Sequence, residues 1–152
     1  ETDTLGFNIH TIDDLPPKGI CGSGVIDLAA RLFQAGMIDV RGKLVPAVCG
    51  PSVKKIDGLL HLVVVPAKDS DTGSDLTISQ ADLDSLIRSK AAMYTILETI
   101  TASVGIAPQD LESFYVAGTF GSFIKPESAI AVPERASSEA ASSAARPRLT
   151  EL

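Results

Sequence analysis

The sequence contains no Trp, only 5% aromatic residues, and no cluster of Lys and Arg. A nucleic-acid-binding protein needs a clustered positive surface to neutralise phosphates, and a single-strand binder also needs aromatic side chains for base stacking. The 152 residues instead carry 19 acidic and 13 basic side chains, for a formal net charge of −6. The composition therefore argues against a nucleic-acid partner.

Cysteine is scarce, and long apolar runs are missing. Cys21 and Cys49 form no CxxC pair, which excludes a zinc ribbon, a local iron–sulfur motif and a disulfide scaffold within this stretch. The longest apolar stretch, Leu59 to Ala67, is far shorter than the roughly 18 residues that a membrane span needs. No basic-then-apolar signal segment opens the sequence, which starts at Glu1. We therefore expect a cytoplasmic fragment with no membrane partner.

The sequence does contain the ingredients of one globular domain. Apolar residues make up 45% and charged residues 21%, as is usual for soluble domains. Apolar residues at helical spacing from Val25 to Met37 predict a helix, with Gly36 near its end. The β-branched runs from Lys43 to Val48 and from Leu59 to Val65, bounded by turn residues, predict a pair of strands.

The second half of the sequence continues this alternation. Ser79 and Asp82 have the spacing of a capping box at the start of a long helix, which Gly105 ends. The segment from Ser113 to Ala117 reads as a short buried strand, and Pro126 suits the first turn of another helix. Helices alternating with short strands predict an α/β fold.

The first candidate site is the segment Gly22, Ser23 and Gly24 at the start of the first predicted helix. Helix N-termini present unpaired N–H groups and a positive dipole end to phosphate, and glycines allow close approach. The spacing matches neither a Walker loop nor the dinucleotide motif GxGxxG. The alternative is that Ser23 only caps the helix and the glycines only permit close packing.

The second candidate site is the segment Gly118, Thr119, Phe120 and Gly121, which directly follows the predicted strand. Ligands bind at the carboxyl edge of the strands in α/β folds, and a glycine backbone can lie flat against a base or ribose. The alternative is a tight strand-to-helix turn with Phe120 in the core.

Two further residues carry chemistry of possible functional use. Lys90 lies near the apolar face of the long helix, where its ammonium either contacts a nucleotide or extends to solvent. Cys21 lies at a helix start, where the dipole can lower its pKa, but no His is near in sequence to act as its base. No hydrolytic triad or metal cluster can be assembled, so we predict neither a catalytic residue nor a metal ligand.

Taken together, these segments resemble the C-terminal part of the reductive activators of corrinoid proteins, which are ATPases of the actin, sugar-kinase and chaperone superfamily. The resemblance covers Pro17 to Ala131. Its blocks are residues 19–28 with 34–39, residues 76–83 with 89–92, and residues 116–129. Three blocks in the right order are far more specific than any one of them.

The resemblance implies a ribonuclease-H-like, actin-like ATPase fold, a mixed sheet with packed helices, in which two lobes close on ATP and Mg²⁺. In that family, ATP binding and hydrolysis drive electron transfer from an iron–sulfur domain to an inactive cob(II)alamin protein, which returns to cob(I)alamin. The segment Gly118 to Gly121 would match the adenosine motif. The helices that carry Gly22–Gly24 and Lys90 would form other walls of the nucleotide site.

The family's two phosphate motifs and its iron–sulfur domain have no counterpart in this sequence. The resemblance therefore implies an incomplete domain: a connector at 1–18, a nucleotide-binding lobe at 19–132, and a flexible Ala/Ser-rich tail at 133–152. We expect no ATPase activity from this chain alone. Two alternatives remain open: a non-catalytic assembly module without its own ligand, which could form a homodimer, and a Cys21-dependent enzyme.

Overall fold

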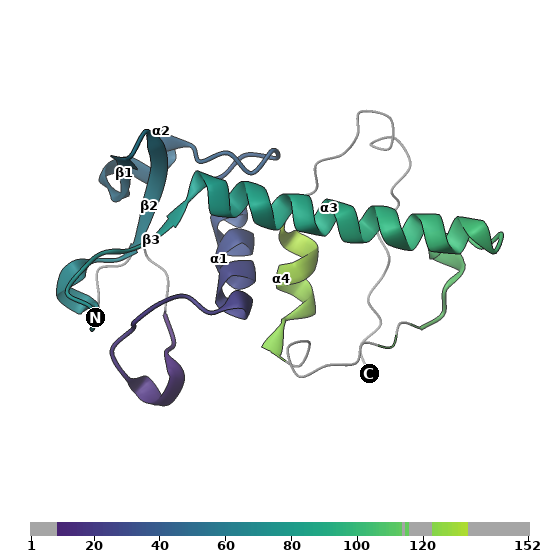
Figure 1. Ribbon diagram of the computed structural model, residues 1–152, viewed down its shortest axis with the longest axis horizontal. Helices are drawn as coiled ribbons and strands as arrows, with labels where there is room; N and C mark the ends of the chain where they lie inside the picture. The colour runs from purple at the N-terminus through teal and green to yellow at the C-terminus, as the bar shows by residue number, and fades with distance from the viewer. Residues whose placement is uncertain (1–8, 114, 116–122, 134–152) are drawn as a thin grey trace.

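The computed structural model describes residues 9–113, 115 and 123–133. A small sheet lies at one end of the long helix α3 (Gln80–Ser103), and two shorter helices stand against that helix (Figure 1). These are α1 (Gly22–Gln34) and α4 (Pro126–Ala131), which pack against each other. The expected α/β fold class is confirmed.

The two shorter helices form where the sequence predicts them. Helix α1 buries Ala29, Ala30 and Leu32, which lie on one face at helical spacing. The chain leaves the helix through Gly36, whose φ of 69° is typical of a glycine after a helix end. Helix α4 begins with Pro126, where a missing N–H costs no hydrogen bond.

The three strands form one antiparallel sheet in the order β1 (Val53–Ile56), β2 (Leu59–Val65) and β3 (Leu76–Ser79). A two-residue turn at Asp57 and Gly58 joins the first two strands, and both residues have positive φ. Such turns match the natural twist of paired strands. The central strand β2 supplies Leu62, which is fully buried.

The sequence pattern predicts one strand wrongly and misses two, β1 and β3. The segment from Lys43 to Val48 makes only an isolated bridge from Leu44 and then the single helical turn α2 (Pro46–Cys49). Proline at its start favours a helix start over a central strand. The strand β3 gives little sequence signal because it has only four residues and passes directly into α3.

Shorter 3-10 turns connect these elements. They lie at Ile12–Asp14, Gly50–Ser52, Ala67–Asp69 and Pro108–Asp110. The expected strand from Ser113 to Ala117 falls mostly outside the described residues, as does the expected tail. No helix among the residues described is both long and apolar enough to serve as a membrane span.

Helix α3 begins with the capping box that the sequence predicts. The Ser79 hydroxyl accepts from the Asp82 N–H at 3.1 Å, and the Asp82 carboxylate accepts from the Ser79 N–H at 2.9 Å. The Ser79 hydroxyl and then its N–H lower the pKa of Asp82 by bonding to its charged form. The helix ends before Gly105, whose φ is 72°.

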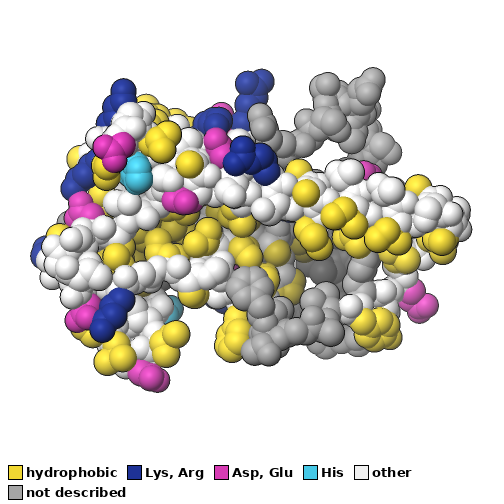
Figure 2. Space-filling view, in the orientation of Figure 1, with side chains coloured by type: hydrophobic (Ala, Val, Ile, Leu, Met, Phe, Trp, Pro, Cys, Tyr) yellow, Lys and Arg dark blue, Asp and Glu magenta, His cyan; other side chains and the backbone are white. Residues whose placement is uncertain are grey.

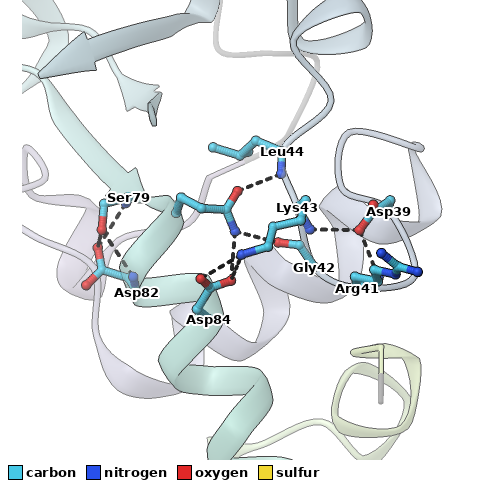
Figure 3. A network of polar contacts seen from close by, with 9 residues as sticks. Asp39, Arg41, Gly42, Lys43, Leu44, Ser79, Asp82 and Asp84 are labelled. Carbon is cyan, nitrogen blue, oxygen red and sulfur yellow. Dashed lines mark hydrogen bonds and ion pairs between the residues drawn. The ribbon is translucent and has the colours of Figure 1, made fainter. Parts of the chain in front are cut away.

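A turn that follows α1 docks onto the first turns of α3 through polar contacts (Figure 3). The Gln80 side chain accepts from the Leu44 N–H and donates to the Gly42 carbonyl, both at 2.8 Å. The Lys43 ammonium donates to both carboxylate oxygens of Asp84 at 2.8 Å. Burial alone would raise the pKa of Asp84, but hydrogen bonds from Lys43 and Gln80 lower it overall.

The same turn makes a close apolar contact with α3. Gly42 has a φ of 74°, and a Cβ built on it would lie 1.8 Å from Cδ1 of Ile87. Ile87 belongs to the buried core and is only 1% exposed. The core therefore joins α1, this turn, the sheet and α3. Its largest fully buried side chains are Leu32, Ile38, Leu62, Leu83 and Ile87.

We predict that Gly42→Ala destabilises the fold much more than Gly36→Ala. Each substitution costs about 1–2 kcal/mol for left-handed backbone, but only Gly42→Ala also overpacks the core, at about 1–3 kcal/mol more. Gly36 is the matched control because its φ is also positive and nothing lies within 4 Å of the point that a Cβ would occupy. Urea unfolding measures both; equal losses would show that the contact with Ile87 is easily relieved.

Candidate nucleotide site

The segment Gly22 to Gly24 forms the first turn of α1, as expected, but the capping residue is different. The N-cap is Cys21, whose Sγ accepts from the Gly24 N–H at 3.4 Å. The Ser23 hydroxyl lies 3.3 Å from that sulfur and belongs to the helix itself. The interpretation of Ser23 as the cap is therefore wrong. Sulfur was not the expected acceptor because hydroxyl and carboxylate side chains dominate helix caps.

The helix start gives Cys21 an unusual environment. The Ser23 hydroxyl and then the Gly24 N–H lower the pKa of the Cys21 thiol, because both stabilise the thiolate. The Cys21 side chain is exposed, whereas Cys49 is buried and desolvation raises its pKa. The two thiols of the chain thus differ in both access and acidity.

One of the glycines has a packing role of its own. A Cβ at Gly24 would lie 3.3 Å from both the Cys21 sulfur and a methyl carbon of Ile20, so a larger side chain would crowd the cap. Gly19 is different, since a Cβ there would have nothing within 4 Å. Close packing thus explains why position 24 is a glycine. At Gly19, before the helix, the space around the backbone is open.

Lys90 extends from α3 to the end of α4. Its ammonium donates to the carbonyl oxygens of Ile130 at 3.2 Å and Val132 at 2.7 Å. The side chain is half-buried, and Val132 is only 3% exposed. The simple interpretation of a lysine extending to solvent is therefore wrong, because its ammonium bonds to protein carbonyls instead.

The other end of α4 is tied to α1. The Lys125 ammonium lies 3.6 Å from a carboxylate oxygen of Asp27, in the second turn of α1. The second carboxylate oxygen of Asp27 is buried and has no hydrogen-bond partner among the described residues. Helix α4 thus has a charged contact at each end, one to α1 and one to α3.

Among the predicted site residues that the structure describes, Gly22–Gly24 and Lys90 lie apart. Helices α1 and α4 both end toward α3, so the Gly22–Gly24 turn lies at the end of α1 remote from Lys90 (Figure 1). Helix α1 has 13 residues and spans about 20 Å at 1.5 Å per residue. Gly118, Thr119, Phe120 and Gly121 lie outside the described residues.

The two best-formed pockets in the described part of the chain lie away from these residues. One open pocket of about 380 Å³ lies between the end of α3 and the 3-10 turn at Pro108–Asp110, and another of about 350 Å³ lies beside Pro16 and Pro17. Neither is lined by Gly22–Gly24 or Lys90. Within the described ranges, no group of three or more His, Cys, Asp or Glu could hold a metal ion.

We predict that iodoacetamide at neutral pH labels Cys21 and spares Cys49. The lowered pKa gives Cys21 more thiolate at pH 7, while Cys49 is buried and less acidic. Ser23→Ala removes the largest cause of the shift, so it should move the pH profile of Cys21 labelling to higher pH. Mass spectrometry of labelled peptides measures both sites; an unchanged profile in Ser23→Ala would contradict the role of the hydroxyl.

Known proteins resemble this chain over most of its length. It is 34% identical over 115 residues to the corrinoid activation enzyme RamQ of Eubacterium limosum, an alignment that covers 71% of this chain and 19% of that protein. Among solved structures, it is similar to a reductive activator for corrinoid, iron-sulfur protein, with a TM-score of 0.75 and 34% identity. That match covers 85% of this chain and 21% of the other. The chain thus spans about a fifth of these relatives.

The match to a domain family covers nearly the whole chain. The family is described as the C-terminal domain of RACo, the ASKHA domain, and it matches residues 1–139. This match and the solved structure confirm both the expected resemblance and the actin-like fold class. The chain belongs to the family of the C-terminal ASKHA domain of RACo.

Proposed function

We propose that this chain is the nucleotide-binding part of an ATP-dependent reductive activator of a corrinoid methyl-transfer protein. The observation that carries the proposal is the similarity, at 34% identity and over 85% of this chain, to a solved reductive activator for corrinoid, iron-sulfur protein. The similarity to a corrinoid activation enzyme supports the same reaction class and the same kind of partner.

The proposed reaction adds one electron to cob(II)alamin and restores cob(I)alamin. The electron comes from an iron–sulfur cluster in a domain outside this sequence, and ATP with Mg²⁺ supplies the driving force. This chain's own contribution is to bind the adenosine half of the nucleotide through Gly118, Thr119, Phe120 and Gly121. The phosphate and Mg²⁺ ligands lie outside this sequence, so the chain alone is expected not to hydrolyse ATP.

The described residues fit a supporting role around such a site. The first turn of α1 presents the backbone N–H groups of Gly22 and Ser23, while the Gly24 N–H is taken by the Cys21 sulfur. The backbone near Gly19 is open, since a Cβ there would have nothing within 4 Å. The α3 segment around Lys90 forms another wall and is held in place by the core residues Leu83 and Ile87. Rigid helices at a binding site reduce the entropy lost when a ligand binds.

The proposal predicts where nucleotide binding changes the backbone environment. In a titration with ATP and ADP, with and without Mg²⁺, amide NMR shifts should cluster at Gly22–Gly24, Lys90 and Gly118–Gly121. If the chain is folded and shows no shifts, nucleotide binding requires both lobes of the domain. The complete protein then decides: its failure to bind ATP contradicts the proposal, as does robust Mg²⁺-dependent ATP hydrolysis by the 152-residue chain that Gly118→Val abolishes.

A second candidate function, an assembly module that forms a homodimer, is favoured by the far half of α3. There Met93, Leu97, Ile100 and Val104 recur every three or four residues and are between 39% and 65% exposed. Hydrophobic side chains line this part of the helix in Figure 2. This spacing is that of a coiled-coil seam, to which an identical helix could pair. Exposed apolar stripes of this kind mark interaction surfaces.

We predict that Ile100→Glu weakens self-association of the chain and that Thr95→Glu does not. Thr95 is also exposed on α3 but lies on the other side of the helix. Losing a buried Ile from each copy should raise the dimer dissociation constant at least about tenfold. Analytical ultracentrifugation over a range of concentrations measures this. A wild-type chain that stays monomeric throughout would rule out the assembly module.

A further inference from the structure

Helix α4 is exposed where it starts and buried where it ends. Lys125, Pro126 and Glu127 at its start are exposed to solvent, whereas Val132 and Pro133, directly after its last turn, are buried. Val132 belongs to the hydrophobic core and is only 3% exposed. Because α4 has only six residues, it is not stable in water without tertiary contacts. The core therefore supports the end of α4 more than its start.

Charged hydrogen bonds also hold the end of α4, which points toward α3 (Figure 1). The Lys90 ammonium donates to the carbonyl oxygens of Ile130 at 3.2 Å and of Val132 at 2.7 Å. The last carbonyl groups of a helix have no partner within it, and a cation near them interacts favourably with the helix dipole. Because the shorter bond is partly buried, water competes little for it. This end of the helix is therefore well fixed.

The start of α4 has a much weaker charged contact. The Lys125 ammonium lies 3.6 Å from a carboxylate oxygen of Asp27 on α1, which is too long for a hydrogen bond. Of the two side chains, 69% of Lys125 and 33% of Asp27 is exposed. Ion pairs between exposed side chains contribute little to stability, and salt screens them.

This ion pair also leaves part of Asp27 unsatisfied. The second carboxylate oxygen, Oδ1, is buried, and no described residue donates a hydrogen bond to it. A buried acceptor without a donor costs stability, because it has lost its hydrogen bonds to water. The contact at the start of α4 is therefore weak for two reasons, solvent exposure and an unpaired oxygen.

We propose that α4 is a strap that opens from its start, with the Lys90 contact at its end as the hinge and the Lys125–Asp27 ion pair as the latch. In the open state the first turn of α4 leaves α1, while Val132 stays in the core. Water then reaches Oδ1 of Asp27, which offsets part of the lost ion pair. The strap opens without unfolding of the rest of the chain, and salt favours the open state because it screens the latch. This motion is independent of the proposed nucleotide-binding function.

Amide hydrogen exchange in the wild-type chain tests the direction of opening. The Ala129 N–H bonds to the Lys125 carbonyl at the start of α4, and the Val132 N–H bonds to the Ser128 carbonyl at its end. After correction for intrinsic rates, Ala129 should exchange at least about tenfold faster than Val132. Raising NaCl from about 0.02 M to about 0.5 M should speed exchange at Ala129 about twofold to fivefold and leave Val132 unchanged. Equal rates at the two amides, or no salt effect at Ala129, overturn the proposal.

Two variants identify the latch. Asp27→Asn removes its negative charge, whereas Arg31→Gln removes an exposed charge one turn further along α1 that bonds to Gln34. Salt should no longer change the exchange of Ala129 in Asp27→Asn, and Arg31→Gln should keep the wild-type response. A salt response that survives in Asp27→Asn shows that another ion pair responds to salt, and it overturns the proposal. The wild-type salt series needs no variant, so it decides even if Asp27→Asn does not fold.

A second pair of variants tests the hinge. Lys90→Met removes the ammonium and keeps most of the side-chain stem, and Arg88→Met removes an exposed charge two residues away. Lys90→Met should speed the exchange of Val132 at least about tenfold, toward the rate of Ala129, and Arg88→Met should change little. Unchanged exchange of Val132 in Lys90→Met contradicts the role of Lys90 as the hinge.

Discussion

The close approach of Gly42 to Ile87 makes a shared core possible in this protein. It brings the turn after α1 so near to the Ile87 side chain of α3 that a Cβ at position 42 would not fit. The Gln80 side chain then hydrogen-bonds to the Gly42 carbonyl and the Leu44 N–H, on either side of Lys43. Without Gln80, these two backbone groups would lose their hydrogen bonds to water and gain no partner in the protein. Through this one turn, α1 and the sheet pack into a common core with the first half of α3.

The two halves of α3 have different surroundings although their sequence pattern is continuous. Its first half is packed by the sheet and by the turn after α1, and it buries Leu83 and Ile87. In its far half the apolar pattern goes on, but Met93, Ile96 and Ile100 are more than half exposed. Periodicity identifies which side of a helix is apolar, and it carries no information on what covers that side.

The candidate site is spread over elements that the core orients. The sequence identifies Gly22–Gly24 and Lys90 as separate candidates, and the structure places them at different ends of the α1–α4 pair. The local signals are correct for the helix start and for the amphipathic position of Lys90. The destination of the Lys90 ammonium could not be predicted, because its partners are backbone carbonyls 40 residues or more away in sequence.

Local sequence is sufficient to specify α1 and its terminal Gly36, the Asp57–Gly58 turn, the Ser79–Asp82 capping box, and α4 after Pro126. These features involve residues a few positions apart, so their hydrogen bonds and backbone angles are encoded locally. Three other features needed the folded chain: residues 46–49 turn into a helix, Leu76–Ser79 pairs with β2, and Lys90 bonds to the end of α4. Each of these depends on groups that are distant in sequence and meet only when the core has formed.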